Sequence, residues 1–480
     1  MEKKDNYEQN DFAGYSNSSK IQLFSLFFFI GILNHLGTIL VMTGGRLLTI
    51  ELNMKPYVTL YTSVATIFSI MTRMVNSNLC LKVSYKKRVI IICFWMMCGY
   101  LSMFLVLTLH ESALNQYNVL CFILSFVPCF FLGSSYAFGE SAMIAYLRLF
   151  PKTLIGGWSS GTGLSGIISG GLNLLTQLLN GLSLKFLYLI LTPVGPVYLL
   201  LFLWTFKLLR KDNNSLIEQI SNDDIEKIEE EQKEKDTKKE NKNINDENEK
   251  NNKENIEIIK EIEELKDEKT MDDMNKHNKT MSFTNFFVVM KMCGRVIINL
   301  GFIYFTQFVC VNSVVIRNSN KIDIPFLPIS ENNDKKLIRK GKYEFINIFF
   351  QLGMFTSKTF IKIVRRIQPI EIYTIAISTI TIIYFIEYYS GFLPWWSFPI
   401  INYILGFFSG GTYAGGFYVI LHSGRVLLDY KELTVNIATI FNDAGTFLSG
   451  LVGYWLMNYI IDSDDAFPGQ ELNFIKSKIW

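Results

Sequence analysis

Two acidic residues interrupt segments that are otherwise apolar enough to cross a membrane. Glu140 ends the segment 133–140, GSSYAFGE, and Asp443 follows Asn442 in an apolar segment nearer the C-terminus. An ionisable group near the centre of a bilayer costs from about 3 to more than 10 kcal/mol, so it normally faces a partner or a watery cavity. Such a carboxylate can carry a coupling proton or bind a cation, or it can hold helices together. We favour the functional interpretation for Glu140 and leave both open for Asp443.

Arg73 is the basic residue that we expect to pair with Glu140, because it lies well inside the second apolar segment. A guanidinium can also bind an anionic group such as a phosphate through its two parallel N–H bonds. A long basic side chain can instead reach the membrane surface. The sequence leaves these roles of Arg73 open.

Small polar residues follow Glu140 in the segment 158–163, WSSGTG. Glycines at near-four spacing allow membrane helices to approach closely, so we assign them to packing. Hydroxyl groups can also hydrogen-bond a polar solute in a central cavity. This makes further residues candidates for a substrate or proton pathway, with packing as the alternative for each: Ser159, Ser160, Thr162, Gln351, Asn34, Tyr136 and Tyr413. Lone histidines such as His35 and His422 are expected to pack or to hydrogen-bond, with pH sensing as the less favoured alternative.

The composition predicts a polytopic membrane protein. Of the 480 residues 49% are hydrophobic and 14% are aromatic, and the apolar segments repeatedly reach the roughly 20 residues that span a bilayer. We expect eleven spans, at 21–42, 57–79, 89–109, 118–146, 153–179, 184–206, 285–311, 343–364, 370–389, 395–421 and 433–461.

Charge divides the chain into unlike parts. The segment between the sixth and seventh spans is rich in Asn, Lys, Glu and Asp and too polar to fold alone, whereas the short loops on one side of the membrane are basic. Basic loops favour the cytoplasm, which places the N-terminus and the insert there. The predicted organisation is a cytoplasmic tail at 1–20, a six-helix half at 21–210, a disordered acidic linker at 211–283, a five-helix half at 284–461 and a tail at 462–480.

Several short patterns in the sequence carry less weight. Asp212, Leu216 and Ile217 have the spacing of an acidic dileucine signal that sorting adaptors bind, although chance is the favoured explanation in such a sequence. The seven cysteines lie in or beside apolar segments without ligand spacing, so we expect packing thiols and neither disulfides nor a metal site. No cofactor motif, catalytic set or nucleic-acid-binding stripe is present, and we expect no enzymatic activity and no nucleic-acid partner.

An internal repeat indicates the fold. The segment 133–139, GSSYAFG, resembles 410–416, GGTYAGG, at an offset of 277 residues, and a looser similarity relates the glycines around 166–171 to those around 445–450. Repeats in the same order and orientation, six helices apart, are typical of the major facilitator fold, whose substrate path runs between two parallel halves. We therefore predict an all-α polytopic membrane protein with a major facilitator-like fold of about eleven transmembrane helices and no twelfth.

Blocks spread over both halves resemble the battenin family of lysosomal and vacuolar membrane proteins. They are Gly139-Glu140, the WSSGTG block, QLGMFTS at 351–357, and Asp443 with LSGLVG at 448–453. Lys358 stands where the family commonly has Arg, which keeps the charge but not the forked geometry. Gly415 and Tyr418 replace the family's Asn and His, and the C-terminus has no cysteine for prenylation.

The resemblance implies a transporter in the membrane of a lysosome, vacuole or endosome, with glycerophosphodiesters or basic amino acids as solutes and a role in organelle pH. We predict a secondary transporter of a small polar solute that works by alternating access and is linked to protons, with Lys358 added to the candidate pathway residues. The alternative is a membrane scaffold or trafficking factor that acts through its cytoplasmic linker. The predicted partners of the protein are the solute, protons, the lipid bilayer and sorting adaptors.

Overall fold

The structure is a computed structural model that describes residues 17–54, 57–78, 83–112, 117–147, 154–179, 183–208, 279–331, 337–364, 370–422, 426–427 and 430–460. Most of both predicted tails and of the acidic linker, as well as the sorting pattern at Asp212, Leu216 and Ile217, lies outside the described residues.

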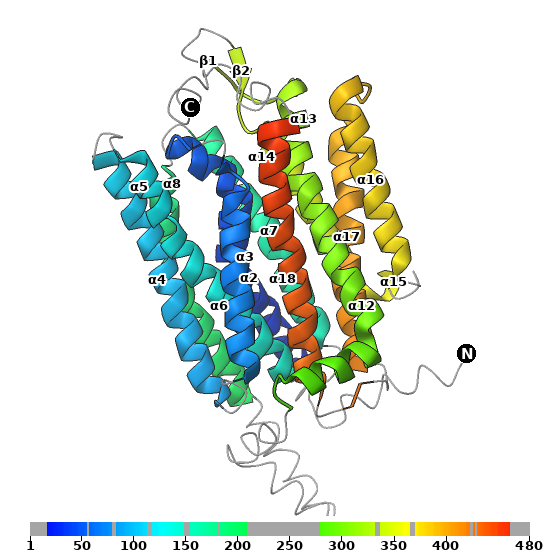
Figure 1. The fold of residues 1–480 in the computed structure, drawn as a ribbon. Helices are drawn as coiled ribbons and strands as arrows, with labels where there is room; N and C mark the ends of the chain where they lie inside the picture. The colour runs from blue at the N-terminus through cyan, green and yellow to red at the C-terminus, as the bar shows by residue number, and fades with distance from the viewer. Residues whose placement is uncertain are drawn as a thin grey trace, which may run out of the picture.

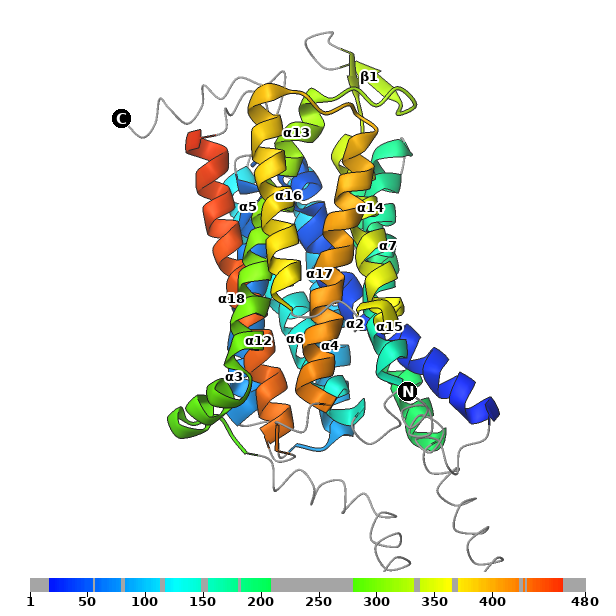
Figure 2. The same ribbon diagram turned by 90° about the vertical axis from the view of Figure 1, so that its right-hand side faces the viewer.

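The described chain is an upright bundle of long helices (Figures 1 and 2). Its helices are α2 (Asn17–Glu51), α3 (Leu60–Asn78), α4 (Tyr85–Ser112), α5 (Asn118–Leu124), α6 (Phe126–Leu147), α7 (Leu154–Leu178), α8 (Leu184–Leu191, the start of a helical segment that reaches Leu208), α12 (Phe283–Val309), η3 (Cys310–Val315), α13 (Ile316–Lys321), α14 (Lys342–Thr359), α15 (Ile361–Val364), α16 (Glu371–Ser390), α17 (Ser397–His422), α18 (Lys431–Trp455) and η5 (Leu456–Ile460).

Seven of these helical segments are long and apolar enough to cross a membrane. They are Ser18–Glu51, Tyr85–Ser112, Asn118–Leu147, Leu184–Leu208, Phe283–Lys321, Glu371–Ser390 and Ser397–Leu421. The four long helices α3, α7, α14 and α18 pack among them and are more polar. The prediction of an all-helical membrane protein is confirmed, while the count of eleven spans stays a prediction.

Helix α3 shows why the inner helices are more polar. Its exposed face carries Met71, Met74 and Val75, and its buried face carries hydroxyl groups, Asn76 and Arg73. This arrangement is the inverse of a helix in a water-soluble protein, because lipid tails surround the bundle and polar groups must find partners inside it. The polar face of α3 therefore points into the bundle, where a solute path would lie.

The helices pack in two repeats of the same pattern. In the first half α2 packs on α7, α3 on α6, and α4 on α6; in the second half α12 packs on α18, α14 on α17, and α16 on α17. Each pair of the second half lies six predicted spans after its counterpart. This pattern is the parallel two-half architecture that the internal repeat predicts.

The repeated glycines make equivalent contacts in the two halves. A Cβ atom placed on Gly133 would lie 2.5 Å from the carbonyl oxygen of Ala65 in α3, and one on Gly410 would lie 2.6 Å from that of Met354 in α14. Both glycines thus let the equivalent helix pairs approach closely. The looser similarity has no such match, because Gly166 faces Gln351 of the other half whereas Gly445 faces Gly301 of its own half.

The two halves meet along two helix pairs. Helix α3 lies beside α18 (Figure 1), and α7 lies beside α14 (Figure 2). Glycines line both seams: Gly450 of α18 packs on Ser63, and Gly163 of α7 packs on Phe355. Since the seams belong to the polar helices, any polar site on them is shared by both halves.

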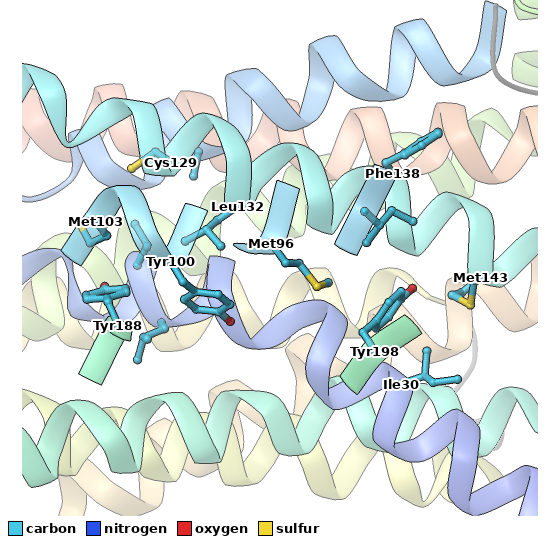
Figure 3. Close-up of a cluster of buried hydrophobic side chains, with 14 of the residues drawn as sticks. Ile30, Met96, Tyr100, Met103, Cys129, Leu132, Phe138, Met143, Tyr188 and Tyr198 are labelled. Carbon is cyan, nitrogen blue, oxygen red and sulfur yellow. The ribbon is translucent and has the colours of Figure 1, made fainter. Parts of the chain in front are cut away.

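Each half has an apolar core of its own. Figure 3 shows part of the core of the first half, where Met96 and Tyr100 of α4 and Leu132 of α6 lie beside Tyr188 and Tyr198 of the segment that begins with α8. The second half is built around a separate cluster that includes Ile303, Ile346, Phe350 and Tyr384. Two side chains of the first half, Val58 and Ile144, also join clusters of the second half, so the cores meet at the seams.

Two expectations about the second half need correction. The seventh helix continues to Lys321 rather than ending at 311, because the π-helical turn η3 keeps the backbone bonded through Cys310–Val315. The connection to α14 also differs from a plain loop, since it contains a short antiparallel hairpin of β1 (Ile329–Glu331) and β2 (Leu337–Arg339) outside the helical bundle. We call the end of the bundle that carries this hairpin the hairpin face.

Substitution of Gly161 by alanine tests the packing within the first half. A Cβ atom at Gly161 would overlap the backbone carbonyl of Phe28 in α2, which cannot yield without moving a helix. We expect Gly161→Ala to lower the free energy of unfolding by about 1–3 kcal/mol, measured by thermal unfolding in detergent. Gly171→Ala in the same helix is the matched control, since nothing lies within 4 Å of a Cβ there. Equal effects of the two substitutions would contradict this packing.

Candidate functional site

Arg73 lies at the seam between the halves and binds both predicted acidic residues. Its side chain is fully buried; Nη2 lies 2.6 Å from Oε2 of Glu140, and Nε lies 2.7 Å from Oδ2 of Asp443. Glu140 belongs to α6 of the first half and Asp443 to α18 of the second half. The predicted pairing of Glu140 with Arg73 is confirmed, and Asp443 joins the same guanidinium from across the seam.

The remaining guanidinium nitrogen of Arg73 is also occupied. Nη1 donates to the carbonyl oxygen of Ala137 at 3.2 Å and to Oγ of Ser141 at 3.1 Å. The ring of Tyr136 lies 5.3 Å from the guanidinium carbon, within the range of a cation–π interaction. Every nitrogen of Arg73 therefore has an acceptor within the protein.

Glu140 binds the second half directly as well. Its Oε1 accepts a hydrogen bond from the hydroxyl of Tyr413 in α17, and Nε2 of His35 lies 3.6 Å from the same oxygen. Glu140 thus joins a basic residue, a phenol and an imidazole that come from three other helices. A change in its charge alters contacts within its own half and across the seam at the same time.

His35 lies in the cluster, a position that the sequence did not indicate. Its ring meets the edges of Tyr136 and Trp158, with centroid distances of 4.8 and 5.8 Å, and its Nε2 faces Glu140. The spacing of residues in the first helix gives no signal of this contact, because it depends on how α2 crosses α6. A histidine beside a buried carboxylate can share or pass on its proton.

Lys358 enters the cluster from α14 of the second half. Its Nζ lies 3.2 Å from Oγ1 of Thr162 and 4.4 Å from the centroid of the Tyr413 ring. The side chain is buried. The lysine that replaces the family's arginine therefore still brings a positive charge to the site, next to the residue that binds Glu140.

The other predicted residues lie beside the cluster or in the packing around it. Ser159 and Ser160 are buried on α7, one turn before Thr162. Gln351 packs against Gly166 across the seam, and Asn34 packs against Gly139 and donates to the carbonyl oxygen of Tyr136 at 3.2 Å. For Gln351 and Asn34 the contacts favour the packing interpretation.

A narrow pocket reaches the cluster from the face opposite the hairpin. Its interior has room for about one water molecule. It is lined by the ends of α6 and α17, the start of α7 and α15: Ile144, Leu147, Ile155, Trp158, Ser159, Ile361, Tyr413, Ala414, Phe417 and Leu421. The site thus has a mostly apolar approach that ends at Ser159 and Tyr413.

Metal and disulfide chemistry have no support in the described part of the chain. Its His, Cys, Asp and Glu side chains form no group of three that could hold a metal ion. Its cysteines, Cys93, Cys98, Cys121, Cys129, Cys293 and Cys310, are free thiols. The cluster is therefore described as an ionic and hydrogen-bonded site.

Comparison with known proteins agrees with this architecture. The family model described as CLN3 protein matches residues 25–463. The chain belongs to this family. Battenin of Dictyostelium discoideum is 24% identical over 410 residues, which cover 84% of this chain and 85% of that protein. The family predicted from the sequence blocks is confirmed.

Solved structures share the fold at low sequence identity. The D-xylose-proton symporter superposes with a TM-score of 0.54 at 10% identity and covers 92% of both chains. A POT family transporter in complex with a thioalcohol-conjugated peptide gives a TM-score of 0.50 at 12% identity, covering 94% of this chain and 92% of that chain. These similarities support the major facilitator-like fold.

Neutralising the ionic cluster tests its balance. Arg73→Gln leaves two buried carboxylates without a cation, and we expect it to lower the free energy of unfolding by about 3–5 kcal/mol. The triple variant Arg73→Gln, Glu140→Gln, Asp443→Asn removes all three charges and should recover much of that loss in thermal unfolding. Arg295→Gln is the control, because Arg295 is 77% exposed and its ion pair with Glu371 lies outside the cluster. A triple variant less stable than Arg73→Gln would show that the charges do not compensate one another.

Proposed function

We propose that this protein is a secondary transporter that moves a small polar solute across the membrane of a lysosome, vacuole or endosome by alternating access, linked to protons. The observation that carries the proposal is the Arg73 guanidinium, held by Glu140 of one half and Asp443 of the other. Burying a charge cluster on a seam between two halves costs desolvation free energy, and buried charges in membrane helices usually serve a function. Protonation of a carboxylate would weaken the connection between the halves and so link proton binding to their motion.

Two further ion pairs join the halves above and below this cluster. Nη1 of Arg46 lies 3.1 Å from Oε1 of Glu344, at the end of α2 and the start of α14 beside the hairpin face. Nη1 of Arg88 lies 3.4 Å from Oε1 of Glu432, where α4 and α18 begin at the opposite end. Ion pairs on both sides of a central site are suited to alternate opening, because each pair becomes hydrated when its end separates.

The identity of the solute is proposed from the family resemblance. It suggests glycerophosphodiesters or basic amino acids, together with a role in organelle pH. The basic short loops favour a cytoplasmic N-terminus and linker. We do not propose an enzymatic activity, since the family and fold resemble transporters. The alternative of a scaffold that acts through its linker predicts normal function without Glu140 and failure when residues 211–280 are removed.

Replacement of Glu140 separates proton coupling from solute movement. In liposomes with an imposed pH gradient, we expect Glu140→Gln to lower proton-driven uptake at least about tenfold, because the site loses its protonatable bridge. Exchange of labelled for unlabelled solute without a gradient should continue. The probes are glycerophosphocholine, glycerophosphoglycerol, lysine and arginine.

Glu111→Gln provides the matched control for this measurement. Glu111 is 65% exposed and pairs with Lys185 far from the cluster, so its loss should leave uptake unchanged. Uptake of none of the four probes by the parent protein would reject the transporter as proposed. Full gradient-driven uptake by Glu140→Gln would reject the role of Glu140 and favour coupling elsewhere.

Removing the charge at Glu344 should open the hairpin face. Thr66 is buried on α3 between the Arg46 level and Arg73, and it bonds only carbonyl groups of its own helix, so Thr66→Cys is a conservative reporter. We expect Glu344→Gln to raise the labelling rate of this cysteine by a charged thiol reagent about tenfold, whereas Arg88→Gln lowers it. The parent chain without the reporter measures labelling of its own cysteines. Equal rates in all three variants would show that neither pair controls access.

A further inference from the structure

The two basic residues of the central site, Arg73 and Lys358, differ in how many hydrogen-bond donors they leave available for a ligand. Each nitrogen of Arg73 already donates to an acceptor, namely Glu140, Asp443, Ser141 or a carbonyl, so four of its five N–H groups are used. Lys358 has no ion pair with any carboxylate of the described residues within 4.0 Å, and its Nζ contacts the Thr162 hydroxyl and the face of an aromatic ring. An ammonium has three donors and no acceptor. A buried cation with a single neutral acceptor is strongly under-satisfied.

Two more donors beside Lys358 lack acceptors. The side chain of Trp158 is 1% exposed and that of Ser159 is 3% exposed, and neither Nε1 of Trp158 nor Oγ of Ser159 has a hydrogen-bond partner. Both residues line the pocket, together with Tyr413, on whose ring the Lys358 ammonium lies. Thr162, which contacts Lys358, lies one helical turn from Ser159. Its hydroxyl donates a hydrogen bond to the backbone carbonyl of Ser159 and so has no hydrogen left for a ligand. The unmet groups are therefore a cation, an indole N–H and a hydroxyl.

A ligand that satisfies these groups must present acceptor oxygens and negative charge. We infer that Lys358, Ser159 and Trp158 bind the acidic group, carboxylate or phosphate, of a small organic anion, which reaches them from the side of the pocket when the halves separate at that end. The apolar lining, with Ile144, Leu147 and Phe417, gives the rest of the anion few polar partners. Arg73 then acts as the bridge between the halves and not as the ligand-binding cation.

Charge balance links this anion to the proton. With His35 neutral, the charges of Arg73 and Lys358 equal those of Glu140 and Asp443, so the buried cluster sums to zero. A singly charged anion such as lactate adds one negative charge at low dielectric, and one proton on the cluster restores neutrality. His35 and Glu140 are the groups placed to receive it. Anion and proton are therefore expected to bind together and move in the same direction.

This inference rests on the proposed transporter, but binding without transport tests it. Purified protein in detergent is titrated with glycerol 3-phosphate, lactate or arginine while its thermal unfolding is followed, since a ligand stabilises the state that it binds. We expect both anions to stabilise the parent protein and arginine to have no effect. Lys358→Met should raise the half-maximal concentration of each anion about thirtyfold or more, because binding weakens. Lys358→Arg should leave that concentration unchanged. Lys291→Met, at an exposed lysine of α12, is the matched control.

Ser159→Ala keeps the inference testable if Lys358→Met does not fold. Because no described residue hydrogen-bonds the Ser159 hydroxyl, its removal should leave the unfolding temperature of the ligand-free protein unchanged. The affinity for the anions should fall about fivefold. Stabilisation by arginine alone, or anion binding that is unchanged in both variants, overturns the inference. Anion binding without flux rejects the transporter but keeps this subsite, and flux that is indifferent to Lys358→Met rejects the subsite alone.

Discussion

The guanidinium of Arg73 is the group on which the arrangement of the two halves depends. It is buried inside a protein whose surroundings are lipid, so its charge must be neutralised by residues that other helices bring to it. Glu140 and Asp443 do so from opposite halves. The same contact therefore balances charge and joins the halves.

The polar helices are explained by this requirement. Helices α3, α7, α14 and α18 carry hydroxyls, amides and glycines on faces that meet other helices, while apolar side chains such as Met71 and Val75 face outward. Close backbone approach at Gly163 and Gly450 seals the seams, and ion pairs at either end of the bundle add contacts that water can replace. The architecture thus combines rigid halves with a seam of exchangeable polar contacts.

The division of labour between the basic residues is the main chemical consequence. Arg73 has the forked geometry that suits two carboxylates, and Lys358 has a compact charge on a flexible stem. The forked geometry of Arg73 suits a lasting bridge between two carboxylates. The flexible lysine suits a ligand that must later dissociate. A lysine that binds a solute is therefore suited to the position where the resemblance to the battenin family implies an arginine.

The sequence by itself determined the membrane class, the duplicated halves and the acids that need partners, because hydropathy, glycine spacing and the cost of buried charge are local properties that survive without a structure. It also selected Arg73 as the partner of Glu140. It took the tertiary structure to bring Asp443 to this guanidinium and His35 to Glu140, and to show that Lys358 has no carboxylate of the described residues within 4.0 Å. Those facts depend on how α2, α14 and α18 cross α3 and α6, and contacts between residues hundreds of positions apart have no local signature.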